Sequence, residues 1–314
     1  MDMQVVDLHC DSLYKSVTQN IGLDSDKLEV KLNLNNDDRR LQCYAIWLPD
    51  NLSGEEAESL FLKAHKKLND ECKRCQINLL KRGDNIRALL KQNKYCAYFT
   101  VENGSAVNGK LENINKFAQM GVKMITLTWN DSNIIGDGAE VANPKGLTYF
   151  GKSVIGEMEK CGIIVDVSHA SEKLFYDVAE LSKLPFVASH SDSAKITPHK
   201  RNLTDEQFKI IAKSGGLVGI NFHREFLSQY PQTSNKYDII RHIDHFLSLG
   251  GENTICLGSD FDGCDLPDDI SGSDFFSELY EHLLRHNYKE RQIEKIFCDN
   301  ALNFFENFDN QRIM

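Results

Sequence analysis

The chain has 314 residues and lacks any apolar stretch approaching the roughly 18 residues that a membrane-spanning helix requires. Its N-terminal segment also lacks the basic and apolar regions of a secretory signal peptide. A basic surplus is missing as well: 36 lysines and arginines face 46 aspartates and glutamates, a net charge of −10. Because nucleic-acid binding needs a basic surface, we expect neither a nucleic-acid partner nor a membrane partner.

The nine cysteines are odd in number and scattered along the chain, which predicts free thiols and a reducing, cytoplasmic location. Cys72 and Cys75 form a C-x-x-C pattern within a charged segment, and no second pair lies nearby to complete a zinc site. We therefore interpret this pair as part of a helix surface. No low-complexity linker divides the chain, so we expect residues 1–314 to form a single metal-dependent hydrolase barrel domain.

Short apolar runs alternate with segments of helical periodicity along most of the chain. Eight strands are predicted, at about 4–9, 41–47, 96–102, 123–128, 163–168, 185–190, 217–222 and 254–260. Most are uniformly apolar, as in a parallel sheet buried on both faces. Two helices are predicted within 54–93, and two more within 273–308. The pattern predicts an α/β fold, a TIM-type (β/α)8 barrel with extra helices; an open doubly wound sheet is the alternative.

The predicted strands repeatedly end at a residue that could hold a metal or move a proton. These residues are His9, Asp11, Glu102, His169, His190 and Asp260. The carboxyl ends of parallel strands meet at one mouth of a barrel, where the active site lies. His9 and Asp11 alternate along a strand and therefore share a face. The set predicts a metal site at the barrel mouth.

Five of these side chains can supply three ligands to each of two ions only if one is shared. A carboxylate can bridge two ions, and Glu102 lies between the two sets in the chain. The predicted cofactors are therefore two Zn²⁺ ions, one held by His9, Asp11 and Glu102, the other by Glu102, His169 and His190. Asp260 remains as the proton shuttle. The predicted reaction is hydrolysis by a hydroxide that bridges the metals.

The sequence resembles the membrane dipeptidase (renal dipeptidase) family of binuclear zinc peptidases, as a soluble bacterial-type member, from about Val5 to Phe308. The motifs that carry the resemblance are Asp-Leu-His9-Cys-Asp11, Val-Glu102-Asn-Gly, Asp166-Val-Ser-His169, Ala188-Ser-His190-Ser, Lys200-Arg201-Asn202 and Gly-Ser-Asp260-Phe-Asp-Gly. The resemblance implies the same metal ligands and places the catalytic acid at Asp260. It also implies that Arg201 binds the substrate carboxylate, a role that suits a planar guanidinium. A homodimer is the family-based expectation.

One position departs from the family. Trp129 stands where the resemblance predicts a substrate-contacting histidine, and an indole cannot carry charge. Asn130 and His223 are candidates to compensate as substrate-binding groups. We expect a zinc-dependent dipeptidase that also accepts a C-terminal D-residue. The alternatives are a binuclear-metal amidohydrolase acting on another amide or lactone, and a barrel that only binds a ligand.

Overall fold

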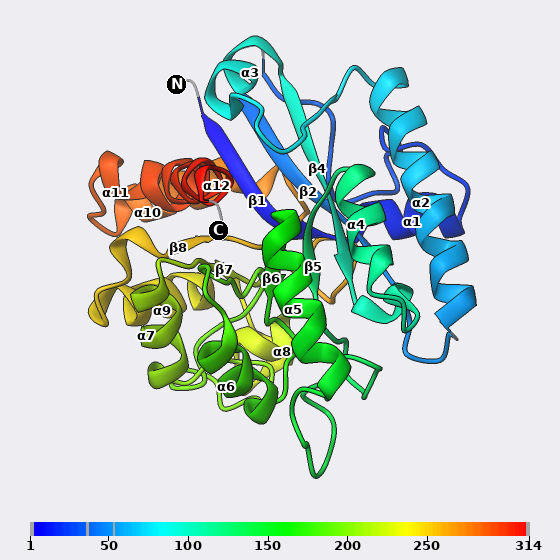
Figure 1. Cartoon of the computed structure of the whole chain (residues 1–314). Coiled ribbons are helices and arrows are strands. Elements are labelled where there is room, and N and C mark those ends of the chain that lie inside the picture. The colour runs from blue at the N-terminus through cyan, green and yellow to red at the C-terminus, as the bar shows by residue number, and fades with distance from the viewer. Residues whose placement is uncertain (1–2, 36–37, 53, 312–314) are drawn as a thin grey trace.

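The computed structural model describes residues 3–35, 38–52 and 54–311. Its centre is a sheet of parallel strands, surrounded by helices (Figure 1). The strands are β1 (Gln4–Cys10), β2 (Arg39–Trp47), β3 (Asn78–Leu79), β4 (Tyr95–Glu102), β5 (Val122–Thr126), β6 (Ile164–Asp166), β7 (Val218–Ile220) and β8 (Ile255–Leu257). Their order is β6-β5-β4-β2-β1-β8-β7, and the short β3 pairs with β4.

The two ends of this sheet are joined through residues 187–188. The amide of Val187 donates to the carbonyl of Val165 at 3.0 Å, and the amide of Ala188 donates to that of Leu217 at 2.9 Å. These bonds close the sheet, which confirms the α/β, TIM-type barrel and rejects the open doubly wound alternative. The strand predicted at 185–190 is reduced to isolated bridges. At Ser189 the backbone ladder is interrupted, because this amide donates to the Asp166 carboxylate rather than to a neighbouring strand.

Helices connect most of the strands, with boundaries set by local capping. They are α1 (Ser12–Thr18), α2 (Gly54–Arg74), α3 (Ile86–Gln92), α4 (Glu112–Gln119), α5 (Tyr149–Cys161), α6 (Glu172–Leu181), α7 (Asp205–Ser214), α8 (Arg224–Leu227), α9 (Lys236–Ser248), α10 (Phe275–Arg285), α11 (Glu290–Glu294) and α12 (Asn300–Asn310). Thr204 and Gln207 form a capping box that opens α7, and Gly215 ends it with φ of 82°. Segment 54–93 holds the two predicted helices plus β3, and 273–308 holds the two predicted there: α10, and a second helix in which α11 and α12 are joined without a break by the π-helical segment Lys295–Asp299.

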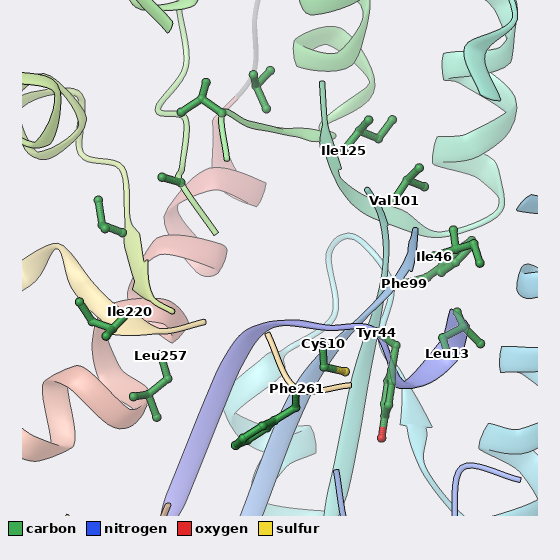
Figure 2. Close-up of a cluster of buried hydrophobic side chains, with 14 of the residues drawn as sticks. Cys10, Leu13, Tyr44, Ile46, Phe99, Val101, Ile125, Ile220, Leu257 and Phe261 are labelled. Atoms are coloured by element: carbon green, nitrogen blue, oxygen red, sulfur yellow. The ribbon is translucent and has the colours of Figure 1, made fainter. Parts of the chain in front are cut away.

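Apolar side chains fill the space between the sheet and the helices. Ile46, Val101 and Ile125 come from β2, β4 and β5, and they lie close together in the core (Figure 2). At the other end of the barrel, Lys123 forms a buried ion pair of 2.5 Å with Asp309 of α12. This packing holds the strands rigidly and so fixes the positions of their carboxyl ends. None of the helices in the described residues is long and apolar enough to cross a membrane.

Candidate active site

The side chain of Glu102 lies at the centre of the predicted site. It ends β4 and is 3% exposed. Its Oε1 lies 2.8 Å from Nε2 of His169 and 3.6 Å from Nε2 of His190. Its Oε2 lies 3.6 Å from Nε2 of His9. One carboxylate oxygen thus faces each of the two predicted ligand sets.

Two buried polar atoms on β1 and just beyond it lack a hydrogen-bond partner among the described residues. They are Nε2 of His9 and Oδ1 of Asp11. The Nε2 atom of His9 lies 3.4 Å from Oδ2 of Asp11 and 3.8 Å from Oδ1 of Asp260. Unpartnered buried atoms are costly, and here they converge with several carboxylates. A divalent cation would satisfy the lone pairs and neutralise the carboxylates, so the donor set fits a metal.

The donor atoms form one continuous cluster. Two groups of three have donor atoms that all lie within 4.8 Å of one another: His9 with Glu102 and His190, and His9 with Asp11 and Asp260. The fifth predicted ligand, His169, adjoins the first group, because its Nε2 lies 3.1 Å from Nε2 of His190. The structure therefore brings all six predicted residues together.

The orientation of His169 is set by Asn130 and by an unusual backbone conformation. The amide oxygen of Asn130 lies 2.8 Å from Nδ1 of His169, so Nδ1 donates and Nε2 keeps its lone pair. The φ angle of His169 is 67°, in the left-handed region that costs a non-glycine residue about 1–3 kcal/mol. Asn130 was predicted as a substrate-binding group, and in the structure its side-chain oxygen supports a predicted metal ligand.

The ring of His190 is held by residues that the sequence interpretation did not identify. The Ser189 hydroxyl lies 2.7 Å from Nδ1 of His190 and donates to Oδ2 of Asp166 at 2.6 Å. Asp166 also accepts from the hydroxyl of Thr126 and from the amide of Ser168. The sequence did contain a signal for this network, because Asp166 is a carboxylate within the apolar run 163–167. A buried aspartate needs several hydrogen-bond donors around it.

Asp260 has the properties of a proton carrier. Its φ of 63° lies in the left-handed region, and Nδ2 of Asn221 donates to its Oδ2 at 2.9 Å. Burial, reinforced by the nearby carboxylates of Asp11 and Glu102, raises the pKa of Asp260 to about 7. A group with this pKa both accepts and releases a proton near neutral pH. By contrast, the carboxylate of Asp262 accepts a hydrogen bond from the Ser12 hydroxyl, which gives it a structural role.

Arg201 is a buried cation with free donors. It is 5% exposed, and its Nε and Nη2 atoms have no hydrogen-bond partner among the described residues. Its guanidinium carbon lies 5.3 Å from the centre of the Phe226 ring. Burial lowers the pKa of Arg201 to about 10, which still leaves it charged at neutral pH. A buried guanidinium with two unused donors suits a carboxylate ligand.

These groups surround a cavity of about 640 Å³. Its lining includes eight of the predicted residues: Asp11, Glu102, Trp129, Asn130, His169, Arg201, His223 and Asp260. His223 follows β7, and its Nδ1 lies 3.1 Å from the carbonyl oxygen of Asp265. The sequence interpretation did not identify His199, Tyr14 or Trp47, which also line the cavity. The space suits a small ligand.

The C-x-x-C pair lies away from this cavity. The side chains of Cys75, Asp24 and Glu71 have donor atoms close enough together to hold a metal ion. The guanidinium of Arg74 pairs with both carboxylates, however, so their oxygens are already engaged. The pair does not lie on a helix surface as predicted, because Cys72 is buried in the core and Cys75 follows the end of α2.

Comparisons with known proteins agree with this geometry. Residues 1–312 match the model of the membrane dipeptidase family (peptidase family M19). An uncharacterized protein in the pqqA 5′ region of Klebsiella pneumoniae is 34% identical over 220 residues, which cover 66% of this chain and 80% of that protein. The structure of dipeptidase AC, a metallopeptidase of family M19, has a TM-score of 0.90 and 26% identity, and 98% of each chain is covered.

A metallopeptidase from Rhodobacter sphaeroides, liganded with a phosphinate mimic of the dipeptide L-Ala-D-Ala, has the same fold. Its TM-score is 0.90 and its identity 24%, over 98% of this chain and 99% of that chain. The family match covers nearly the whole sequence. The chain therefore belongs to the membrane dipeptidase family, peptidase family M19, and is a metal-dependent dipeptidase.

Proposed function

We propose that this dipeptidase uses two Zn²⁺ ions and that Glu102 is the ligand they share. His9 and Asp11 would complete the first site, and His169 and His190 the second. The support is the pair of Glu102 oxygens, which lie toward different histidines, together with the unpartnered atoms of His9 and Asp11. Imidazole and carboxylate donors, three to an ion, suit zinc in a catalytic site with an open position.

When bound, such a pair of ions polarises the scissile carbonyl and lowers the pKa of water. The chain's own residues would do the rest. Arg201 would bind the C-terminal carboxylate of the dipeptide through Nε and Nη2, the two donors that lack protein partners. This buried, unpaired guanidinium beside the acidic cluster is the observation that carries the proposal.

Asp260 would accept a proton from the attacking water and deliver it to the departing amine nitrogen. Its Oδ2 is engaged by Asn221, so Oδ1 is the oxygen available for this transfer. Its raised pKa of about 7 suits both directions. Asp260 is thereby proposed as the catalytic acid and base.

Trp129 needs a separate explanation, because it stands where the resemblance predicts a substrate-contacting histidine. Of the two candidates to compensate, Asn130 already accepts from His169. His223 lines the same cavity; its Nδ1 lies near the Asp265 carbonyl, and its Nε2, 3.9 Å from Oε2 of Glu225, is the ring nitrogen left to contact a substrate. We assign the additional substrate contact to His223.

The test is hydrolysis of dipeptides by the zinc-loaded protein. The panel should contain L-Ala-L-Ala and L-Ala-D-Ala, because an anchor that holds only the carboxylate does not itself distinguish the two configurations. We expect turnover of both. Absence of turnover with every dipeptide would contradict the proposal and favour another amide or a lactone.

Two further proposals concern the whole chain. The nine cysteines are all free, which supports a reducing compartment such as the cytoplasm. The barrel core draws on strands from both halves of the sequence, which supports one domain over residues 1–314. Limited proteolysis of the folded protein checks the second point, since a single domain should resist cleavage into two stable pieces.

A further inference from the structure

Three aromatic side chains form a continuous wall on one side of the active-site cavity. Tyr14 belongs to α1, Trp47 ends β2, and Trp129 follows β5. The ring centres of Tyr14 and Trp47 lie 4.8 Å apart, and those of Trp47 and Trp129 are also 4.8 Å apart. All three residues line the cavity. We call these three residues the aromatic wall.

Trp47, the central ring of the aromatic wall, and the loop that carries Arg201 lie on opposite sides of the barrel mouth. Around the closed barrel, the order is β1, β2, β4, β5, β6, the segment 187–188, β7 and β8. Trp47 ends the second strand of this circle, and Arg201 lies in the loop that follows the sixth. Since a circle of eight places its second and sixth members opposite each other, Trp47 lies across the mouth from the start of the loop that carries Arg201.

The proposed metal ligands Asp11, Glu102 and His169 line the same cavity as these two features, and the ring centres of His169 and Trp129 lie 6.0 Å apart. Glu102 ends β4, the strand between those that precede Trp47 and Trp129. A dipeptide held by its C-terminal carboxylate at Arg201 would therefore extend across the metal cluster. An extended residue spans about 3.3–3.6 Å, so the far end of the substrate, its N-terminal residue, would approach the aromatic wall.

We propose that the aromatic wall is the subsite for the side chain of the N-terminal residue and that it selects aromatic and large aliphatic side chains. This inference rests on the proposed binding of the carboxylate by Arg201. The rings supply apolar faces and a geometry suited to edge-to-face contact. Trp129 is part of the wall in place of a histidine, so the departure from the family becomes a determinant of specificity.

The experiment compares dipeptides that differ only in the N-terminal residue: Gly-Ala, Leu-Ala, Phe-Ala and Lys-Ala. We expect kcat/KM for Phe-Ala and Leu-Ala to exceed that for Gly-Ala by about ten-fold or more. Equal values would overturn the proposal. A preference for Lys-Ala over Leu-Ala would also overturn it, because the wall would then act as a cation site.

Variants locate the effect. Trp47→Ala and Trp129→His should each reduce the Phe-Ala to Gly-Ala ratio of kcat/KM by several-fold. The control is Tyr149→Ala, which removes a 93% exposed ring outside the cavity and should leave this ratio unchanged. Circular dichroism checks that each variant is folded, and Trp129→His offers a milder change should Trp47→Ala fail to fold.

Fluorescence provides a measurement that does not depend on turnover. The chain contains two tryptophans, and both belong to the aromatic wall. Phosphinate mimics of Phe-Ala and Gly-Ala should both bind to the zinc-loaded protein, and the Phe-Ala mimic should bind more tightly and change the emission more. Such binding without hydrolysis of any dipeptide would support the wall and reject the proposed catalysis. Hydrolysis with no difference between the mimics would reject the wall alone.

Discussion

The hydroxyl oxygen of Ser189 lies 2.7 Å from Nδ1 of its chain neighbour, His190. Because the hydroxyl proton is donated to Asp166, Oγ of Ser189 accepts from the Nδ1–H of His190. Nε2 of His190 therefore keeps its lone pair and faces the acidic cluster. Asn130 fixes the tautomer of His169 in the same way.

Ser189→Ala should weaken zinc binding at the second proposed site. Loss of the acceptor frees the imidazole to rotate and change tautomer, and the expected loss of affinity is about 10- to 100-fold. Competition with a chromogenic chelator measures this affinity. Ser153→Ala, at an exposed position on α5, is the matched control. Identical zinc affinity in Ser189→Ala and the wild type would refute the positioning role.

Arg201→Ala should reduce kcat/KM for dipeptides by about 100-fold or more, because charge-assisted hydrogen bonds of this kind contribute roughly 1.5–3 kcal/mol each. The thermal midpoint should not fall, since the variant removes a buried charge whose Nε and Nη2 lack partners. Arg241→Ala, which truncates an arginine with a 58% exposed side chain, is the control. Unchanged kinetics with a lowered midpoint would indicate a structural arginine instead.

His242 should make stability depend on pH. Its Nδ1 accepts from the amide of Ser193 and its Nε2 donates to the carbonyl of Leu227, so the neutral ring ties α9 to the segment that leads to Arg201. Burial lowers the pKa of His242 to about 4. The unfolded chain binds this proton more readily, so the contribution is present above pH 6.5 and is lost as pH falls toward 4. The loss amounts to about 3 kcal/mol.

Urea unfolding of metal-free protein at pH 7.5 and pH 5 measures this effect. His242→Gln keeps a donor for Leu227 but cannot titrate, so it should be less stable than the wild type at pH 7.5 and lose less stability on acidification. The same pH dependence in both proteins would assign the effect to other groups.

The strand pattern and the strand-end residues predicted the barrel because both follow from local chemistry. Uniformly apolar runs predicted β1 and β4, and the capping box at Thr204 predicted the start of α7. The prediction of a regular strand at 185–190 was wrong. At Ser189 the backbone amide donates to the Asp166 carboxylate instead of to a neighbouring strand. That bond joins residues 23 positions apart, and no local pattern reveals it.

The supporting residues of the site were harder to predict for the same reason. The contact between the side-chain oxygen of Asn130 and His169, for example, joins residues 39 positions apart. The aromatic wall likewise combines Tyr14, Trp47 and Trp129 from separate strand ends. Only the closed barrel brings such residues together.

The central claim is that Glu102 is shared by two zinc ions. Elemental analysis of the purified, zinc-reloaded protein tests it most directly, comparing the wild type with Glu102→Gln and with Glu58→Gln as a control outside the cavity. The account predicts two zinc ions per chain for the wild type and for Glu58→Gln. It predicts fewer than one for Glu102→Gln, because both sites lose a charged ligand. A single ion in the wild type, or two ions retained in Glu102→Gln, would contradict it.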